Sequence, residues 1–144
     1  MSLLDCKKAE RSRVSNLTRQ YFTSNPQQPF SDGVLIDGRA LYLSGRIGLK
    51  PGTREVPDSV EEEAELLMED VRGVLSRAGM GFDDLVFVQV FSPDVSLWDR
   101  FNAVYVRHFT GPTPPRAFIG SGPLLFSARF ELQGIAVKDA PAQS

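Results

Sequence analysis

The sequence predicts an α+β domain in which one β-sheet carries two helices on one of its faces. Three observations predict this class. Strand-like segments fill the first third of the chain, an amphipathic helix follows, and strand, helix and strands then alternate. The segment 85–91 (LVFVQVF) is almost wholly apolar, a pattern typical of strands that are buried on both faces. Two helices cover only one face of such a sheet, so we expect the other face to pack against further copies of the chain.

The chain has 144 residues, the size of one domain. We expect a single domain at 24–138, an N-terminal extension at 1–23 with a candidate first strand at 13–22, and a flexible tail at 139–144. The net charge of −2 offers no broad basic surface for nucleic acid, and no apolar run approaches the roughly 20 residues of a membrane span. The single cysteine, Cys6, fits a reducing compartment, so we expect a cytoplasmic protein. With one histidine, His108, and no cysteine cluster, no metal is expected.

The first half of the domain is predicted as a hairpin followed by a long helix. Short strand-like runs at 34–36 and 40–44 are joined by Asp37-Gly38, a strong hairpin turn signal. A helix is predicted over 59–78, because apolar residues recur there on one face and Ser59 and Glu62 form a capping-box pattern. The acidic run at 61–65 is interpreted as the solvated first turns of this helix, and Gly79 is expected to end it.

The second half is predicted as a strand, a helix and two further strands. After the strand at 85–91, Ser96 and Asp99 resemble a second helix cap, and a helical face continues through Tyr105 and His108 to about 110–111. Strands are then expected at 117–120 and 128–137. In the last one, apolar and polar residues alternate, as expected of a strand with one buried face.

Two charged residues near the C-terminal end are the candidates for chemistry. Arg116 follows a Pro-Pro pair and precedes an apolar run, and Glu131 stands between Phe130 and Leu132. We expect these two residues on neighbouring strands, where a fixed cation and a carboxylate would hold a small carboxylated substrate and act on it with water. Each has a plainer alternative, because Arg116 could pair with a carboxylate at a subunit boundary and Glu131 could simply face solvent.

Five segments, taken together, resemble the Rid (reactive intermediate deaminase) family, also called the YjgF or L-PSP family. The segments are PFSDGV, ALYLSGRIGL, DDLVFVQVFSPDVSLWDRFNAVY, PPRAFIG and FELQGIAV, in the family's order and spacing over about 29–137. The resemblance implies a chorismate mutase-like mixed sheet with two helices on one face. It also implies homotrimers around a barrel of sheets, with clefts between subunits that hydrolyse enamines and imines to 2-keto acids and ammonia. No cofactor or metal takes part in that chemistry.

The resemblance also implies roles for individual residues. Arg116 matches the family's signature arginine, which binds the substrate carboxylate, and a planar guanidinium suits this because it donates two parallel hydrogen bonds. Glu131 matches the carboxylate that positions or activates the attacking water. Ser44 and Gly45 match a Ser-Gly pair near the ligand, and Asn102 matches an asparagine that supports the site, either by contact with substrate or by support of the backbone.

The resemblance also implies further substrate-binding positions, which either depart from the family pattern or contribute only backbone atoms. The backbone around Ala117 and Phe118 is expected to hold the imine nitrogen or the developing oxygen. Phe30 stands where the family has a tyrosine, so a hydroxyl is missing, and the bulky Phe118 stands where the family has a small residue or cysteine. Arg46 replaces a glutamine. It would favour a dianionic or larger acidic ligand, or else it forms a surface or interface ion pair.

Two functions other than imine hydrolysis remain as alternatives. A homotrimer that binds a small carboxylate without catalysis, as a sensor or partner-binding module, is favoured by the missing hydroxyl at Phe30. An endoribonuclease or translation inhibitor has less support, because the charge is negative and no pair of histidines is present.

Overall fold

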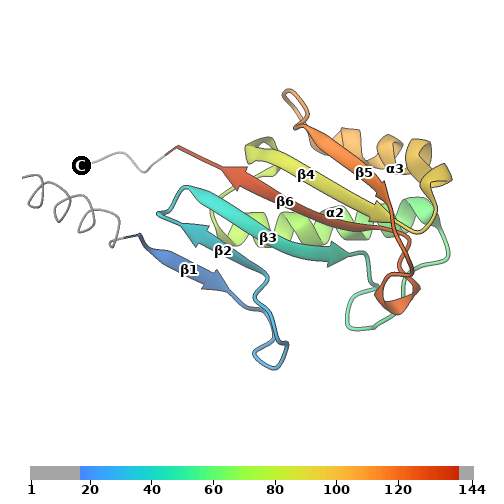
Figure 1. Ribbon diagram of the computed structural model, residues 1–144, viewed down its shortest axis with the longest axis horizontal. Coiled ribbons are helices and arrows are strands. Elements are labelled where there is room, and N and C mark those ends of the chain that lie inside the picture. The colour runs from blue at the N-terminus through green and yellow to red at the C-terminus, as the bar shows by residue number, and fades with distance from the viewer. Residues whose placement is uncertain (1–16, 140–144) are drawn as a thin grey trace, which may run out of the picture.

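The computed structural model describes residues 17–139 and confirms the predicted arrangement of one mixed sheet with two helices on one face (Figure 1). The strand order is β1-β2-β3-β6-β4-β5, and only the β4–β5 pair is parallel. The strands are β1 Arg19–Phe22, β2 Gly33–Ile36, β3 Ala40–Ile47, β4 Leu85–Ser92, β5 Arg116–Gly120 and β6 Glu131–Val137, and the helices are α2 Val60–Arg77 and α3 Trp98–Tyr105. The predicted first strand is thus confirmed at 19–22, and its residues 13–16 lie outside the described part of the chain.

The hairpin between β2 and β3 forms at the predicted turn. Asp37 and Gly38 both have positive φ, 51° and 64°, which is the backbone of a two-residue turn whose twist matches that of the flanking strands. The Asp37 carboxylate also accepts a hydrogen bond from the backbone N–H of Thr18, at 2.9 Å. Strand β3 then continues to Ile47, three residues beyond the predicted end, because its second half pairs with β6.

Helix α2 has the predicted bounds and cap, but one acidic residue of its first turns is buried. The Ser59 hydroxyl accepts from the backbone N–H of Glu62 at 3.2 Å, and Gly79, with φ of 69°, follows the C-cap. Glu63 is fully buried, so the expectation that the whole acidic run is solvated was wrong. Its carboxylate accepts from the backbone N–H groups of Arg129 and Phe130 and pairs with the Arg129 guanidinium at 2.8 Å.

This clamp has two consequences. It explains why β6 begins at Glu131 and not at Ala128, because the preceding backbone N–H groups bond to Glu63 and not to a strand. It also affects the carboxyl group of Glu63, since burial raises the pKa of that group even though the hydrogen bonds and charge of Arg129 oppose the shift.

The second helix is shorter than predicted and its cap lies elsewhere. The side chain of Asp94, and not that of Ser96, accepts the capping hydrogen bond, from the backbone N–H of Ser96 at 3.0 Å, and a 3-10 turn (Val95–Leu97) leads into α3. The α-helix ends at Tyr105, and His108 belongs to a further 3-10 turn. The apolar periodicity of the sequence extends from the α-helix into this 3-10 turn, because a 3-10 turn also places residues that are three apart on the same side.

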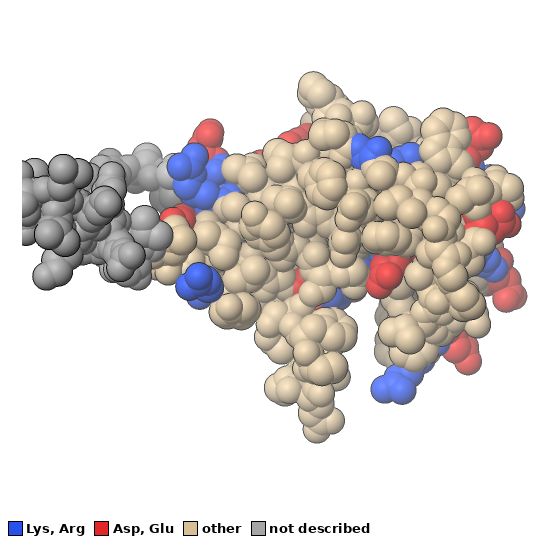
Figure 2. Space-filling view, viewed as in Figure 1, with Lys and Arg blue, Asp and Glu red and all other residues tan. Residues whose placement is uncertain are grey.

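The sheet has one covered face and one open face. On β4, Val88 and Val90 are fully buried beneath the helices, whereas Phe87 remains 40% exposed. Within a single chain, this strand is therefore buried on one face only, and not on both faces as predicted. Directly paired residues on the open side form a continuous row across five strands: Tyr21, Val34, Tyr42, Ile135 and Phe87. Figure 2 shows that this side of the molecule carries few charged side chains.

Candidate functional site

A cavity of about 490 Å³ opens beside the second half of β3, where β2 has ended and no longer pairs with it. It lies between the loop that connects β1 to β2 and the loops that follow β3 and precede β6, where Figure 2 shows a notch. Polar and apolar side chains share its lining: Gln28, Phe30, Ser44, Gly45, Arg46, Ile47, Leu49, Asp70, Leu125, Phe126 and Glu131. The structure thus brings five of the predicted site residues to one cavity: Phe30, Ser44, Gly45, Arg46 and Glu131.

A β-bulge places the polar floor of this cavity. The register between β3 and β6 shifts between Leu43 and Arg46, so that Ser44 and Gly45 share the irregular step. Bulges of this kind redirect side chains and are frequent next to active sites. A Cβ atom at Gly45 would lie 2.6 Å from Oε1 of Glu131, so only glycine lets this carboxylate lie against the strand backbone.

The Ser44 hydroxyl is held in place by the neighbouring loop. It donates a hydrogen bond to the backbone carbonyl of Ser31 at 2.5 Å, and the Ser44 backbone N–H donates to the carbonyl of Asp32 at 3.0 Å. The hydroxyl oxygen keeps lone pairs for an incoming donor such as water or an imine N–H. Phe30, at the cavity's edge, is 52% exposed and offers only its ring.

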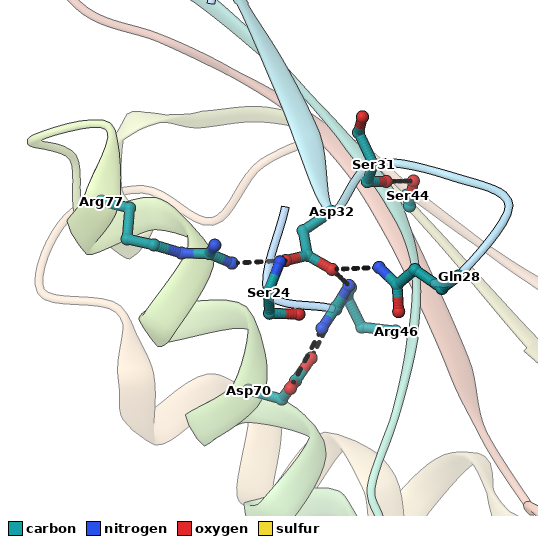
Figure 3. A network of polar contacts seen from close by, with 8 residues as sticks. All are labelled: Ser24, Gln28, Ser31, Asp32, Ser44, Arg46, Asp70 and Arg77. Atoms are coloured by element: carbon teal, nitrogen blue, oxygen red, sulfur yellow. Dashed lines mark hydrogen bonds and ion pairs between the residues drawn. The ribbon is translucent and has the colours of Figure 1, made fainter. Parts of the chain in front are cut away.

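A buried carboxylate organises one wall of the cavity (Figure 3). Asp32 accepts hydrogen bonds from the backbone of Ser24 at 2.8 Å, Gln28 at 3.0 Å, Arg46 at 2.9 Å and Arg77 at 2.8 Å. Burial by itself raises the pKa of Asp32, but these hydrogen bonds, that from Arg77 foremost, outweigh it and hold the pKa well below its usual range. Asp32 is therefore an ion in the folded protein, and it positions two residues that line the cavity.

Arg46 donates its side-chain hydrogen bonds to two carboxylates and not into the cavity. Beside its bond to Asp32, its Nε and Nη2 donate to the two oxygens of Asp70, at 2.5 and 3.2 Å (Figure 3). Burial alone lowers the pKa of Arg46, yet the hydrogen bonds and charges of Asp70 and Asp32 raise it overall. The ion-pair alternative for Arg46 accounts for these contacts.

Arg116, the first residue of β5, lies away from this cavity and packs against three aromatic rings. Its guanidinium carbon is 4.7 Å from the ring centroid of Tyr105 and 5.7 Å from those of Phe101 and Phe118. Within residues 17–139 no carboxylate pairs with Arg116 and no acceptor takes a hydrogen bond from it. Burial lowers the pKa of this guanidinium, and Tyr105 offsets part of the shift. A half-buried guanidinium that contacts only aromatic rings keeps its N–H groups free to donate to an anion.

The surroundings of Arg116 also contain polar atoms without partners. Oδ1 of Asn102 and the hydroxyl of Tyr105 are buried and have no hydrogen-bond partner in the part of the chain that the structure describes. Both residues line a second hollow, of about 380 Å³, together with Arg116. Asn102 therefore lies beside Arg116, the predicted carboxylate-binding residue, and does not line the first cavity.

Arg116 and Glu131 are not on neighbouring strands, and that expectation was wrong. Strand β4 lies between β5 and β6, with Arg116 opposite Val88 and Glu131 opposite Phe91. Since Val88 faces the helices and Phe91 is an odd number of residues away, Arg116 and Glu131 point to opposite faces of the sheet. Within one chain, Glu131 and Arg116 therefore line two different hollows.

The remaining predicted positions follow β5. Ala117 is paired with Gln89 and Phe118 with Val90, so their side chains point to opposite faces. Phe118 packs against the rings of Phe101 and Phe130, with centroids 5.8 and 6.4 Å away, and does not line the first cavity. In this chain the bulk of Phe118 packs against the hydrophobic core.

Among residues 17–139, one group of side chains has the spacing of metal ligands. Ligating atoms of Glu65, Glu69 and His108 lie within 4.8 Å of one another. Arg72 lies in the same group, because it donates to Glu69 at 3.2 Å and approaches Nδ1 of His108 to 3.3 Å. Ion pairing accounts for these contacts, and the absence of a metal remains a prediction.

Of the helices in this part of the chain, none is long and apolar enough to cross a membrane.

Asp32 and Asp70 were not identified from the sequence as parts of the site. Asp70 is 24 residues from Arg46 along the chain and Asp32 is 45 residues from Arg77, so no local pattern joins them. The one available signal was Arg46 itself, because an arginine on a largely apolar strand calls for a carboxylate partner.

Comparison with known proteins supports the resemblance read from the sequence. Residues 22–138 match the family model described as Endoribonuclease L-PSP. The chain is 38% identical to Protein DfrA of Myxococcus xanthus, over 76% of this chain and 85% of that protein. It is 33% identical to the mouse 2-iminobutanoate/2-iminopropanoate deaminase, over 76% of this chain and 82% of the relative.

A solved structure agrees with the sequence comparisons. The crystal structure of E. coli TdcF with bound serine superposes with a TM-score of 0.68 at 28% identity, covering 81% of this chain and 94% of TdcF. Together with the sheet order and the two helices, these matches establish the relationship: the chain belongs to the L-PSP family, the family also called YjgF or Rid.

Proposed function

We propose that the protein is a cofactor-independent hydrolase that converts reactive imino acids to 2-keto acids and ammonia. The observation that carries this proposal is Arg116, a half-buried guanidinium for which residues 17–139 offer no counter-ion. A substrate carboxylate would supply the missing anion. The relative named as a 2-iminobutanoate/2-iminopropanoate deaminase and the relative solved with bound serine act on or bind molecules with such a carboxylate.

The proposed chemistry needs one anion-binding group and one base. Arg116 binds the carboxylate through paired charged hydrogen bonds. Glu131 takes a proton from water as the water oxygen bonds to the imine carbon, and the nitrogen gains a proton. The proton that Glu131 took is the one that the nitrogen gains, which gives an amino alcohol. As this collapses, its hydroxyl loses a proton to form the keto group, the carbon–nitrogen bond breaks and the nitrogen leaves with that proton as ammonia, so one water is consumed and one ammonia is released. Ser44, whose oxygen can accept a hydrogen bond, lies beside Glu131 in the cavity lining and would orient the water or the imine N–H.

This chemistry requires a second copy of the chain, because Arg116 and Glu131 face opposite sides of one sheet. We propose that the half-sites of adjacent subunits meet in a homotrimer. The open-face row from Tyr21 to Phe87 supports association, because its exposed aromatic rings (Tyr21 62%, Tyr42 49%, Phe87 40%) form an apolar surface that soluble monomers seldom leave uncovered.

Size measurement tests the assembly. We expect light scattering to give a mass about three times that of the chain, and Tyr42→Arg, which places a charge in the row, to shift the mass toward the monomer. Val95→Arg is the matched control, since Val95 is also exposed but lies on the turn before α3. A monomeric wild-type protein that still hydrolyses imines would refute the shared site.

Imine hydrolysis tests the chemistry directly. An amino acid oxidase generates 2-iminobutanoate in situ, and semicarbazide traps the imine that escapes hydrolysis. We expect the wild type to reduce the trapped fraction, Arg116→Ala and Glu131→Ala to abolish that effect, and Arg100→Ala to retain it. Arg100 is a suitable control because its guanidinium pairs with Glu61 on the surface.

The alternative is a homotrimer that binds small carboxylates without catalysis. Phe30 favours it, because the cavity has a ring and no hydroxyl at this position. A correctly assembled wild type that binds 2-oxobutanoate through Arg116 but accelerates no imine would decide for this alternative. In that case Phe30→Tyr is the variant in which to look for recovered hydrolysis.

A further inference from the structure

One wall of the first cavity is apolar and comes from the loop before β6. Leu125 and Phe126 line it there, and Phe30, Ile47 and Leu49 complete it from the other side. Leu125 is 73% exposed and Phe126 is 42% exposed, so neither side chain has been taken up by the core. Large apolar side chains kept at the mouth of a cavity, and not in the core, indicate a surface that contacts something else.

The backbone of this loop holds Phe126 in an unfavourable conformation. Phe126 has φ of 56° and Ser127 has φ of 57°, two consecutive non-glycine residues in the left-handed region. This region is a genuine outlier for a bulky residue, and such conformations are concentrated at ligand-binding positions. The Phe126 ring is further held by Arg54, whose guanidinium lies 5.6 Å from the ring centroid. The loop thus fixes an aromatic ring at the cavity, where no internal packing requires it.

The charges around the cavity disfavour an acidic side chain. Among the residues that line the cavity, Arg46 is the cation that could attract one, but two oxygens of Asp70 and one of Asp32 already take its hydrogen bonds. Glu131 and Asp70 add negative charge to the lining. A second carboxylate on the ligand would therefore meet repulsion and no free cation among the lining residues, which argues against the dianionic ligand that the sequence suggested for Arg46.

We propose that the wall formed by Leu125 and Phe126 selects imino acids with bulky, uncharged apolar side chains over small or acidic ones. This inference rests on the proposed hydrolase function. Arg116 and Glu131 act on groups that every imino acid shares, so they do not distinguish one side chain from another. The apolar wall is the part of the cavity that meets the variable side chain, and removal of water from both surfaces favours the larger apolar group.

The test compares three imines made in situ from alanine, leucine and glutamate by oxidases that accept each amino acid. We expect kcat/KM to be at least tenfold higher for the leucine-derived imine than for either of the others. Phe126→Asn should lower the leucine-to-alanine ratio of kcat/KM about tenfold. Asparagine is chosen because it tolerates the left-handed backbone and so removes the ring without straining the loop. Leu125→Ala should act in the same direction, and Trp98→Ala, an exposed aromatic outside the cavity lining, should leave the ratio unchanged.

A binding measurement separates failure of this inference from failure of the hydrolase proposal. Calorimetry with pyruvate, 4-methyl-2-oxopentanoate and 2-oxoglutarate reports side-chain preference without catalysis. If no imine is hydrolysed but the leucine-derived keto acid binds best and Phe126→Asn removes that preference, the inference stands and the hydrolase proposal fails. Equal rates for all three imines, a preference for the glutamate-derived one, or a ratio unchanged in Phe126→Asn would overturn the inference while leaving the hydrolase in place. Binding of none of the three keto acids, without hydrolysis, would overturn both.

Discussion

Arg46 and Arg116 show two ways in which this fold holds a partly buried arginine. Arg46 makes three hydrogen bonds to two carboxylates, and one of these, Asp32, is itself fully buried. Arg116 rests on three aromatic rings, and among the described residues it has no carboxylate partner. The first arrangement is internally complete and belongs to the structure. The second leaves the guanidinium without an anion among the described residues, and for this reason we propose Arg116 as the carboxylate-binding residue.

Removal of the acceptor at the centre of the paired region should have the largest effect. Asp32→Asn leaves Arg46 and Arg77 beside a neutral group, and breaking a buried ion pair in this way costs about 3–5 kcal/mol of the free energy of unfolding. Urea denaturation measures this loss. Glu61→Gln, which breaks the exposed pair with Arg100, is the control and should leave the midpoint unchanged. Equal small effects in both variants would show that the Asp32 cluster does not hold the fold.

Neutralisation of the unpaired arginine should separate activity from stability. Arg116→Gln should lower kcat/KM for imines about 100-fold, since a charge-assisted hydrogen bond contributes about 1.5–3 kcal/mol. The free energy of unfolding should stay within about 1 kcal/mol, because the rings lose only a cation–π contact. Arg46→Gln should do the reverse and destabilise the protein more than it slows it. If Arg116→Gln unfolds the protein instead, its role is structural.

Acid should weaken the paired region. The pKa of Asp32 is lowered in the folded protein, so its contribution to stability is fully present above its unfolded pKa of about 3.9 and is lost as the pH falls below that value. Glu63 has a raised pKa, so its protonation acts in the opposite direction and favours the folded state on acidification. Thermal melts between pH 6 and pH 2 should show a steeper loss for the wild type than for Asp32→Asn. Parallel curves would mean that other carboxylates govern the acid limb.

The smallest effect should come from the hydroxyl beside Arg116. Burial raises the pKa of Tyr105 to about 12, and in residues 17–139 its hydroxyl has no hydrogen-bond partner. Tyr105→Phe should therefore change the free energy of unfolding by less than about 0.5 kcal/mol, since no hydrogen bond is lost. Tyr105→Ala is the contrast, because loss of the ring beneath Arg116 should cost about 3–5 kcal/mol. A loss above about 1 kcal/mol in Tyr105→Phe would indicate that a second subunit bonds this hydroxyl.

Local patterns in the sequence were enough to predict most of the elements. The Asp37-Gly38 turn, the Ser59 cap and the apolar stripe of α2 act over a few residues, and the structure confirms each of them. The predictions that were wrong involve contacts between distant segments. Glu63 was placed in solvent because nothing within the helix reveals that Arg129 and Phe130 donate to it from 66 and 67 residues away.

The sequence by itself determined the kinds of groups available for chemistry and the elements that carry them. It named Arg116 and Glu131, the hairpin and the two helices, because residue type, short-range periodicity and family motifs are properties of a linear chain. Only the tertiary structure decided how these groups are distributed: β4 lies between β5 and β6 and separates Arg116 from Glu131, and Asp32 and Asp70 engage Arg46. The physical reason is that strand order and ion pairing follow from burial of the whole sheet beneath its helices, which no single segment specifies.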